Sequence, residues 1–196
     1  MSATGAAARQ TLPAGEGDAV HRRHVVSALV VDRPGTLNRV SGLLRARSFN
    51  IESLTVGTTN EPGRSRMTIA LRGDDGHLRQ VLAQLERLID VLEVTDLTSV
   101  PRIELELVLV ELDPPRTPER ERSLGDILSA AGGEVLTTGL GVWRARLTAP
   151  PETIDQALDA LRSHGLRSLV RAGAVALAAE TTEPEAPSSE NGATQA

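Results

Sequence analysis

The feature that most constrains this fold is a pattern of predicted strands and helices that runs twice along the chain. The first run has four predicted strands, at residues 24–31, 51–59, 66–71 and 91–97. The second run has four more, at residues 103–112, 134–138, 142–147 and 166–178. The first strands of the two runs begin 79 residues apart, which indicates one structural unit present twice with little repeated sequence.

Each run also contains two amphipathic helices, after its first and third strands. The first helix of the chain has apolar residues at Leu37, Val40, Leu43 and Leu44, and the second at Leu78, Val81, Leu82, Leu85 and Ile89. The order in each run is βαββαβ, a split βαβ unit in which both helices cover one face of an antiparallel sheet. The predicted fold class is therefore α+β, with two tandem ferredoxin-like units.

The unit boundaries follow from this pattern and from the composition of the two ends. We expect one unit at residues 23–99 and a second at residues 100–180. Residues 1–22 and 181–196 are polar or Ala/Gly-rich without periodicity, and we expect both to be disordered tails. A unit of this size is marginally stable alone and has open sheet edges, so we predict a homodimer.

Composition excludes several classes of function. Phe49 and Trp143 are the only aromatic residues, and the chain carries a net charge of −5, so it lacks both the stacking platforms and the basic excess of a nucleic-acid binder, including an RNA-recognition module of the same strand order. There is no cysteine, no apolar run of membrane-spanning length and no secretion signal at the N-terminus. We expect a cytoplasmic protein without membrane contact.

Catalysis by this chain has no support in the sequence. The four histidines, His21, His24, His77 and His164, are far apart, and the known nucleophile, phosphate-loop and metal motifs are missing. His24 and His77 fit structural positions at the start of a strand and of a helix. We predict no catalytic residue and no metal site.

The most informative segment is DRPGTL, residues 32–37, between the first strand and the first helix. The amides of Gly35, Thr36 and Leu37 at a helix start could hold a carboxylate, and Asp32 could receive an ammonium group. The loop is thus suited to a small zwitterion such as an α-amino acid. The alternative from the residues alone is that Asp32 caps the helix and Pro34-Gly35 only turns the chain.

Asn50 begins the second strand, at the far end of the first helix from that loop. Within one chain we expect Asn50 not to reach Asp32, so its structural interpretation is a turn residue. If two units pair side by side, Asn50 of one chain can approach the loop of the other and add an amide donor and acceptor.

A family resemblance lies in residues 24–98. The run HVVSALVVDRPGTLNRVSGLLRARSFNIESLTVGTTNEPGRSRMTI resembles the N-terminal ACT domain of the acetolactate (acetohydroxyacid) synthase small regulatory subunit. The motif DRPGTL is shared by many ACT domains, whereas FNIESL followed by SRMTI is specific to this subunit. The second half is similar to the family's C-terminal domain, most clearly at LVRAGAVAL, residues 169–177.

The resemblance implies a non-catalytic partner of a large subunit that condenses pyruvate with thiamine diphosphate (ThDP), Mg²⁺ and FAD. The small subunit is implied to raise that activity and to confer feedback inhibition by valine or another branched-chain amino acid. The implied effector site joins Asp32, Pro34, Gly35, Thr36 and Leu37 of one chain to Asn50 and Ile51 of its partner. The family often has Asn where this chain has Asp32, and the segment DPPRTP at residues 113–118 also departs from the family. A different function, a stand-alone ACT-domain amino-acid sensor for another enzyme or a transcription factor, remains open.

Overall fold

The computed structural model of the chain describes residues 22–46, 50–139 and 141–179. Arg22, which the sequence assigns to the N-terminal tail, already belongs to the first strand. The rest of that tail, Phe49 and residues 181–196 lie outside the described residues.

The first unit has the predicted order of elements. They are β1 (Arg22–Val31), α1 (Thr36–Ala46), β2 (Asn50–Thr58), β3 (Arg64–Gly73), α2 (Asp75–Leu85) and β4 (Val91–Asp96). The strands form an antiparallel sheet in the order β2-β3-β1-β4, which leaves β2 at one edge. The ferredoxin-like arrangement is therefore confirmed.

The central strand β1 is buried on both faces. Val26, Ala28 and Val30 pack in the core cluster against α1 and α2, while Val25 on the other face packs against Leu97 and Ala176. Successive strand residues alternate between faces, so a strand covered on both sides is apolar at nearly every position, as residues 25–31 are apart from Ser27.

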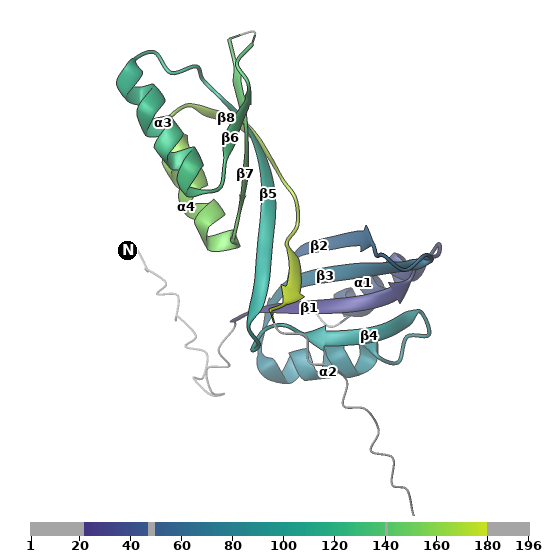
Figure 1. Cartoon of the computed structure of the whole chain (residues 1–196). Coiled ribbons are helices and arrows are strands. Elements are labelled where there is room, and N and C mark those ends of the chain that lie inside the picture. The colour runs from purple at the N-terminus through teal and green to yellow at the C-terminus, as the bar shows by residue number, and fades with distance from the viewer. Residues whose placement is uncertain (1–21, 47–49, 140, 180–196) are drawn as a thin grey trace, which may run out of the picture.

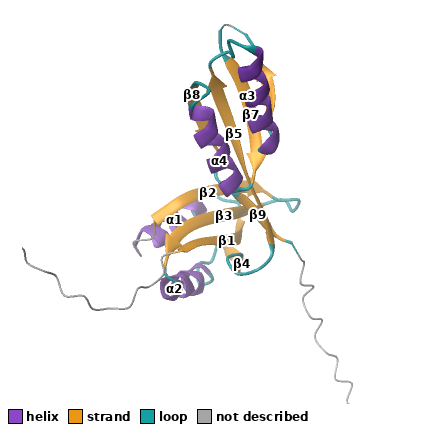
Figure 2. Ribbon diagram, turned by 90° about the vertical axis from the view of Figure 1, so that its left-hand side faces the viewer, coloured by secondary structure: helices purple, strands orange, loops and turns teal. Residues whose placement is uncertain are grey.

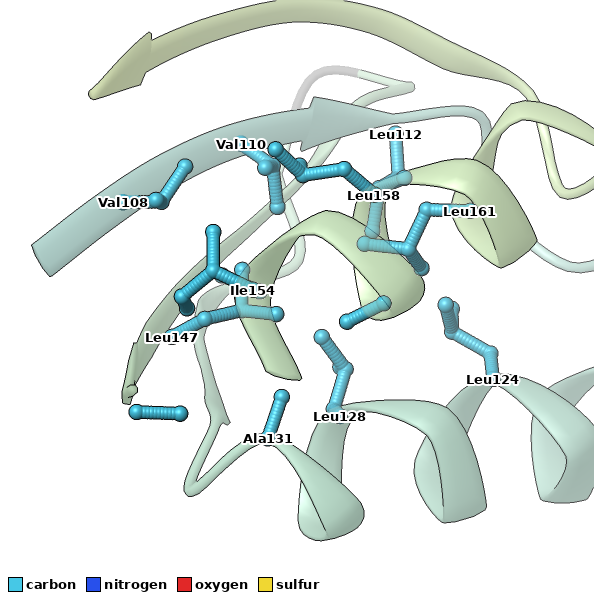
Figure 3. Packing of buried hydrophobic residues seen from close by; sticks show 13 residues of the cluster. Val108, Val110, Leu112, Leu124, Leu128, Ala131, Leu147, Ile154, Leu158 and Leu161 are labelled. Carbon is cyan, nitrogen blue, oxygen red and sulfur yellow. The ribbon is translucent and has the colours of Figure 1, made fainter. Parts of the chain in front are cut away.

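The second unit repeats the architecture with one additional strand. Its elements are β5 (Arg102–Leu112), α3 (Pro118–Ala130), β6 (Glu134–Thr137), β7 (Trp143–Ala149), α4 (Pro151–Arg162), β8 (Leu166–Arg171) and β9 (Val175–Ala178). The main sheet has the order β6-β7-β5-β8. Figure 3 shows how Leu124 and Leu128 of α3 meet Ile154, Leu158 and Leu161 of α4 beneath this sheet.

One predicted strand is in fact two, which corrects the prediction for residues 166–178. β8 pairs with Val108–Leu112 of β5, whereas β9 pairs with Arg102–Leu105 of the same strand. Residues 172–174 lie between them. Three residue steps on β5, from Leu105 to Val108, face four steps on the returning chain, from Arg171 to Val175, so the pairing shifts by one residue where β5 continues beyond its own sheet toward the first unit (Figure 1).

Two apolar residues at helical spacing are exposed, although the spacing predicts that they pack in the core. Ile89 is 84% exposed, because α2 ends at Leu85 and the chain continues in turns. Leu37, at the start of α1, is 45% exposed, while Val40 and Leu44 are fully buried. Core contact therefore begins one turn later in α1 and ends one turn earlier in α2 than the sequence predicts.

The second unit stands on the face of the first sheet that carries no helices. In Figures 1 and 2, β5 and β9 run down onto β1 and β3 from the side opposite α2. Ala176 of β9 completes the small cluster with Val25 and Leu97. Both faces of the first sheet are thus partly covered, one by helices and the other by the ribbon of β5 and β9.

A Gly132→Ala variant should be less stable by roughly 2 kcal/mol. Gly132 follows the C-terminal cap of α3, Ala131, and has φ of +57°; a Cβ there would lie 2.5 Å from the backbone oxygen of Thr148. Gly125→Ala is the matched control, because Gly125 lies within α3 with no atom within 4 Å of an added Cβ. The control should gain up to about 1 kcal/mol from helix propensity. Denaturant unfolding measures both, and equal stability of the two variants would contradict the prediction.

Candidate effector site

The loop from β1 to α1 is held by its own backbone. The Asp32 amide donates to the Gly63 carbonyl at 2.9 Å, and Thr36 Oγ1 donates to the Val31 carbonyl at 3.2 Å. Gly35 has φ of +92°, a conformation that residues with a Cβ rarely adopt. These contacts fix the direction in which α1 leaves the sheet.

The first turn of α1 offers unpaired amides. The Thr36 amide donates to the Arg33 carbonyl at 3.3 Å, and the first helical bond runs from the Arg39 amide to the Gly35 carbonyl at 3.1 Å. Within the described part of the chain, the amides of Leu37 and Asn38 donate no hydrogen bond. The first turn also has no acidic residue, so its partial positive charge is not neutralised locally.

Asp32 is exposed beside this helix start. Across residues 22–46, 50–139 and 141–179, its carboxylate accepts no hydrogen bond and forms no ion pair. It therefore does not cap α1, and the purely structural alternative for this residue is not what the structure shows. Among the described residues, a carboxylate without a partner therefore lies four residues before Thr36, where α1 begins with two amides that donate no hydrogen bond.

A buried carboxylate that the sequence does not reveal anchors the loop. Asp90 precedes β4, is 1% exposed, and forms ion pairs with Arg33 and with Arg39, the latter at 3.2 Å between Nη2 and Oδ2. The Arg39 guanidinium lies 3.4 Å from the point that a Cβ on Gly35 would occupy. Asp90 thereby holds the two arginines that precede and follow Gly35 in the sequence. No motif or spacing marks Asp90 in the sequence.

Asn50 and Ile51 lie at the other end of the sheet from the loop. Asn50 pairs with Arg72 on β3, whereas Val31 pairs with Arg64. Eight residues of extended strand separate these two positions, about 27 Å at 3.4 Å per residue. Asn50 is exposed, and Ile51 packs against the core. One chain alone does not bring Asn50 to Asp32, as the sequence predicts.

An open hollow of about 610 Å³ lies beside the start of β2. It is lined by Asn38, Ser41, Gly42 and Arg45 of α1, and by Ile51. No atom lies within 4 Å of a Cβ added to Gly42, so this face of α1 has room for a neighbouring element. The hollow adjoins the edge strand β2, which pairs only with β3 among the described strands.

The remaining polar candidates have structural roles. His24 is buried, and its Nε2 donates to the Gly73 carbonyl at 2.9 Å. Asp74 caps α2 by accepting from the His77 amide at 2.9 Å, and this bond together with the His77 side chain lowers the pKa of Asp74 to about 2. In the described ranges, no group of three metal-ligating side chains occurs, and no helix is long and apolar enough to cross a membrane.

Two tandem βαββαβ units with helices on one face of each sheet define a protein of ACT-type regulatory domains. The profile of the AHAS (acetohydroxyacid synthase) small subunit-like ACT domain matches residues 26–93. The chain is 39% identical over 154 residues to a probable acetolactate synthase small subunit of Methanothermobacter thermautotrophicus, covering 79% of this chain and 91% of that one.

Further comparisons agree with this match. The chain is 36% identical over 164 residues to the acetolactate synthase small subunit of Aquifex aeolicus, covering 84% of this chain and 85% of that one. The crystal structure of the Thermotoga maritima acetolactate synthase small subunit superposes with a TM-score of 0.73 at 28% identity, covering 82% of this chain and 99% of that one. The chain belongs to the family of acetolactate synthase small subunits.

Proposed function

We propose that this chain is the regulatory subunit of an acetolactate synthase, raising the activity of a catalytic large subunit and making it sensitive to valine or another branched-chain amino acid. The observation that carries the proposal is that one short loop, among the described residues, has both two amides without a hydrogen bond, at Leu37 and Asn38, and a carboxylate without a partner, at Asp32. These groups match the two charged ends of an α-amino acid.

Each part of the loop has a role in binding. The effector carboxylate is held by the helix start, which Gly35 leaves open because it has no Cβ. The effector ammonium is held by Asp32. Pro34 and Thr36 fix the loop conformation, and the exposed side chain of Leu37 contacts the apolar part of the effector.

The second half of the site comes from a partner protomer. Two β2 strands that pair antiparallel across a two-fold axis would place the start of one strand beside the end of the other. The end of β2 lies at the same end of the sheet as the loop, since Thr58 pairs with Ser65 and Val31 with Arg64. Asn50 and Ile51 of the partner would then approach residues 32–37. The open edge of β2 and the hollow beside α1 support such a homodimer.

In this proposal the catalytic reaction takes place on the large subunit and not on this chain. The large subunit would hold ThDP, Mg²⁺ and FAD, and this chain would contribute binding and regulation only. The family to which the chain belongs supports this division of labour. Capture of a thiamine-dependent large subunit from cell extract separates this proposal from a stand-alone amino-acid sensor, which would capture a different protein.

The proposal predicts direct valine binding by the purified chain. Calorimetric titration should show saturable heat with valine, with about one site per protomer. Valinamide, which lacks the carboxylate, and N-acetylvaline, which lacks the ammonium, should each bind at least about tenfold more weakly, because each loses one charged contact. Equal affinity for all three ligands, or no heat with any branched-chain amino acid, would contradict the proposed site.

A further inference from the structure

The two units enclose a cleft of about 650 Å³ between the first sheet and the start of α4. Its wall in the first unit includes Glu52, Ser53 and Leu54 of β2, and its wall in the second unit includes Ala172 and Gly173. The strand whose first residues belong to the proposed effector site therefore reaches the second unit only a few residues later.

A β-bulge at Glu52 allows β2 to contact both the core of the first unit and the second unit. Ile51 pairs with Leu71 of β3, and Ser53 pairs with the adjacent Ala70, so Glu52 is an extra residue. In a regular strand, Ile51 and Leu54 would point to opposite faces. With the bulge, both pack against the core on the helix side. Ser53 and Thr55 then face the second unit.

The break between β8 and β9 fits against these two side chains. The Ala174 amide donates to Ser53 Oγ at 3.4 Å. A Cβ on Gly173 would lie 3.2 Å from Ser53 Cβ and well inside van der Waals contact with Thr55 Oγ1. Gly173 does not have positive φ. The position requires glycine because of this close approach and not because of its backbone conformation.

An ion-pair network joins the same part of β2 to β5. Arg23 donates from Nε to Glu52 at 2.9 Å and from Nη2 to Glu104 at 2.5 Å. Arg102 also donates to Glu104, at 2.9 Å. Burial alone would raise the pKa of Glu104, but the hydrogen bonds from Arg23 and Arg102 outweigh it and lower that pKa. Arg23 thus links Glu52 of β2 to Glu104 of β5.

We propose that residues 52–55 of β2 transmit effector binding to the second unit. Gly173 is the positioning residue that lets the segment between β8 and β9 pack against residues 52–55. The inference rests on the proposed function and extends it. Effector bound at Asn50 and Ile51 would favour one conformation of the bulge at Glu52. Because Ser53 and Thr55 contact the segment between β8 and β9, that conformation would favour one position of these two strands.

The test is a Gly173→Ala variant of the full chain, reconstituted with the catalytic subunit. Valine binding by the variant, measured by calorimetry, should stay within about twofold of wild type, because an added Cβ at Gly173 would meet Ser53, Leu54 and Thr55 and none of the proposed effector residues. The ratio of uninhibited to valine-saturated activity should fall about threefold or more, because the added Cβ displaces the contact that carries the coupling. A variant with the full wild-type ratio would overturn the inference.

Two further variants separate coupling from misfolding. Thr55→Ala combined with Gly173→Ala removes the clashing hydroxyl, which forms no hydrogen bond with the described residues, and should restore the inhibition ratio to within about twofold of wild type. Gly57→Ala adds a Cβ to the same face of β2 with no atom within 4 Å and should leave the ratio unchanged. Failure of the double variant to recover, or an equal loss in Gly57→Ala, would overturn the steric link. If wild type binds no valine, it is the proposed function that fails, and this inference fails with it.

Discussion

A Gly35→Asp variant should lose most of its response to valine, with affinity reduced by more than about tenfold. Gly35 has φ of +92°, which costs an L-residue about 1–2 kcal/mol. An aspartate there would also place a carboxylate next to the Arg39 guanidinium, where it would compete with Asp90 for that cation. The same negative charge would repel the effector carboxylate at the start of α1. Calorimetric titration with valine measures the loss.

Gly141→Asp is the matched control for this variant. Gly141 has φ of +71° in the hairpin region of the second unit, and no atom lies within 4 Å of an added Cβ. The Gly141→Asp variant therefore also places an aspartate at a positive φ and adds the same charge, but away from the loop. Valine affinity should stay at the wild-type value in the control. If both variants lose affinity equally, strain or net charge explains the effect and the loop is not the binding site.

An Asn50→Ala variant should weaken valine binding by a similar factor, about tenfold or more. The Asn50 amide would bond a charged group of the effector, and such a bond contributes about 1.5–3 kcal/mol. The free chain should be nearly as stable as wild type, because Asn50 is exposed at the start of β2. Thermal unfolding together with calorimetry separates these two effects. Unchanged valine affinity in the Asn50→Ala variant would remove this residue from the site.

The sequence predicts the elements whose signals are local. Three such signals are the apolar run of β1, the turn residues Pro34 and Gly35, and the helical spacing of Val40 and Leu44. Each depends on a few neighbouring residues, so tertiary contacts do not change the structure that it predicts. The loop at residues 32–37 could likewise be predicted from the sequence, because a helix start with a flexible glycine has the same chemistry in any fold.

Features that depend on contacts between residues far apart in the chain could not be predicted from the sequence. Asp90 is a lone acidic residue in the sequence, and its importance arises only because the sheet brings Arg33 and Arg39 to it. The break at Gly173 is likewise set by tertiary contact, since β5 extends to the first unit and the glycine must fit against Ser53 and Thr55. Ile89 keeps the helical spacing although α2 has already ended, because periodicity alone does not mark a helix end.

Each proposed effector site is built from the loop of one protomer and Asn50 of its partner. The most direct test is a mixed dimer of one Gly35→Asp chain and one Asn50→Ala chain, co-expressed with different affinity tags and purified through both. One of its two sites would carry both defects, and the other would have an intact loop and an intact Asn50. The mixed dimer should bind about one valine, with wild-type affinity. A mixed dimer that binds valine no better than either parent variant would contradict it.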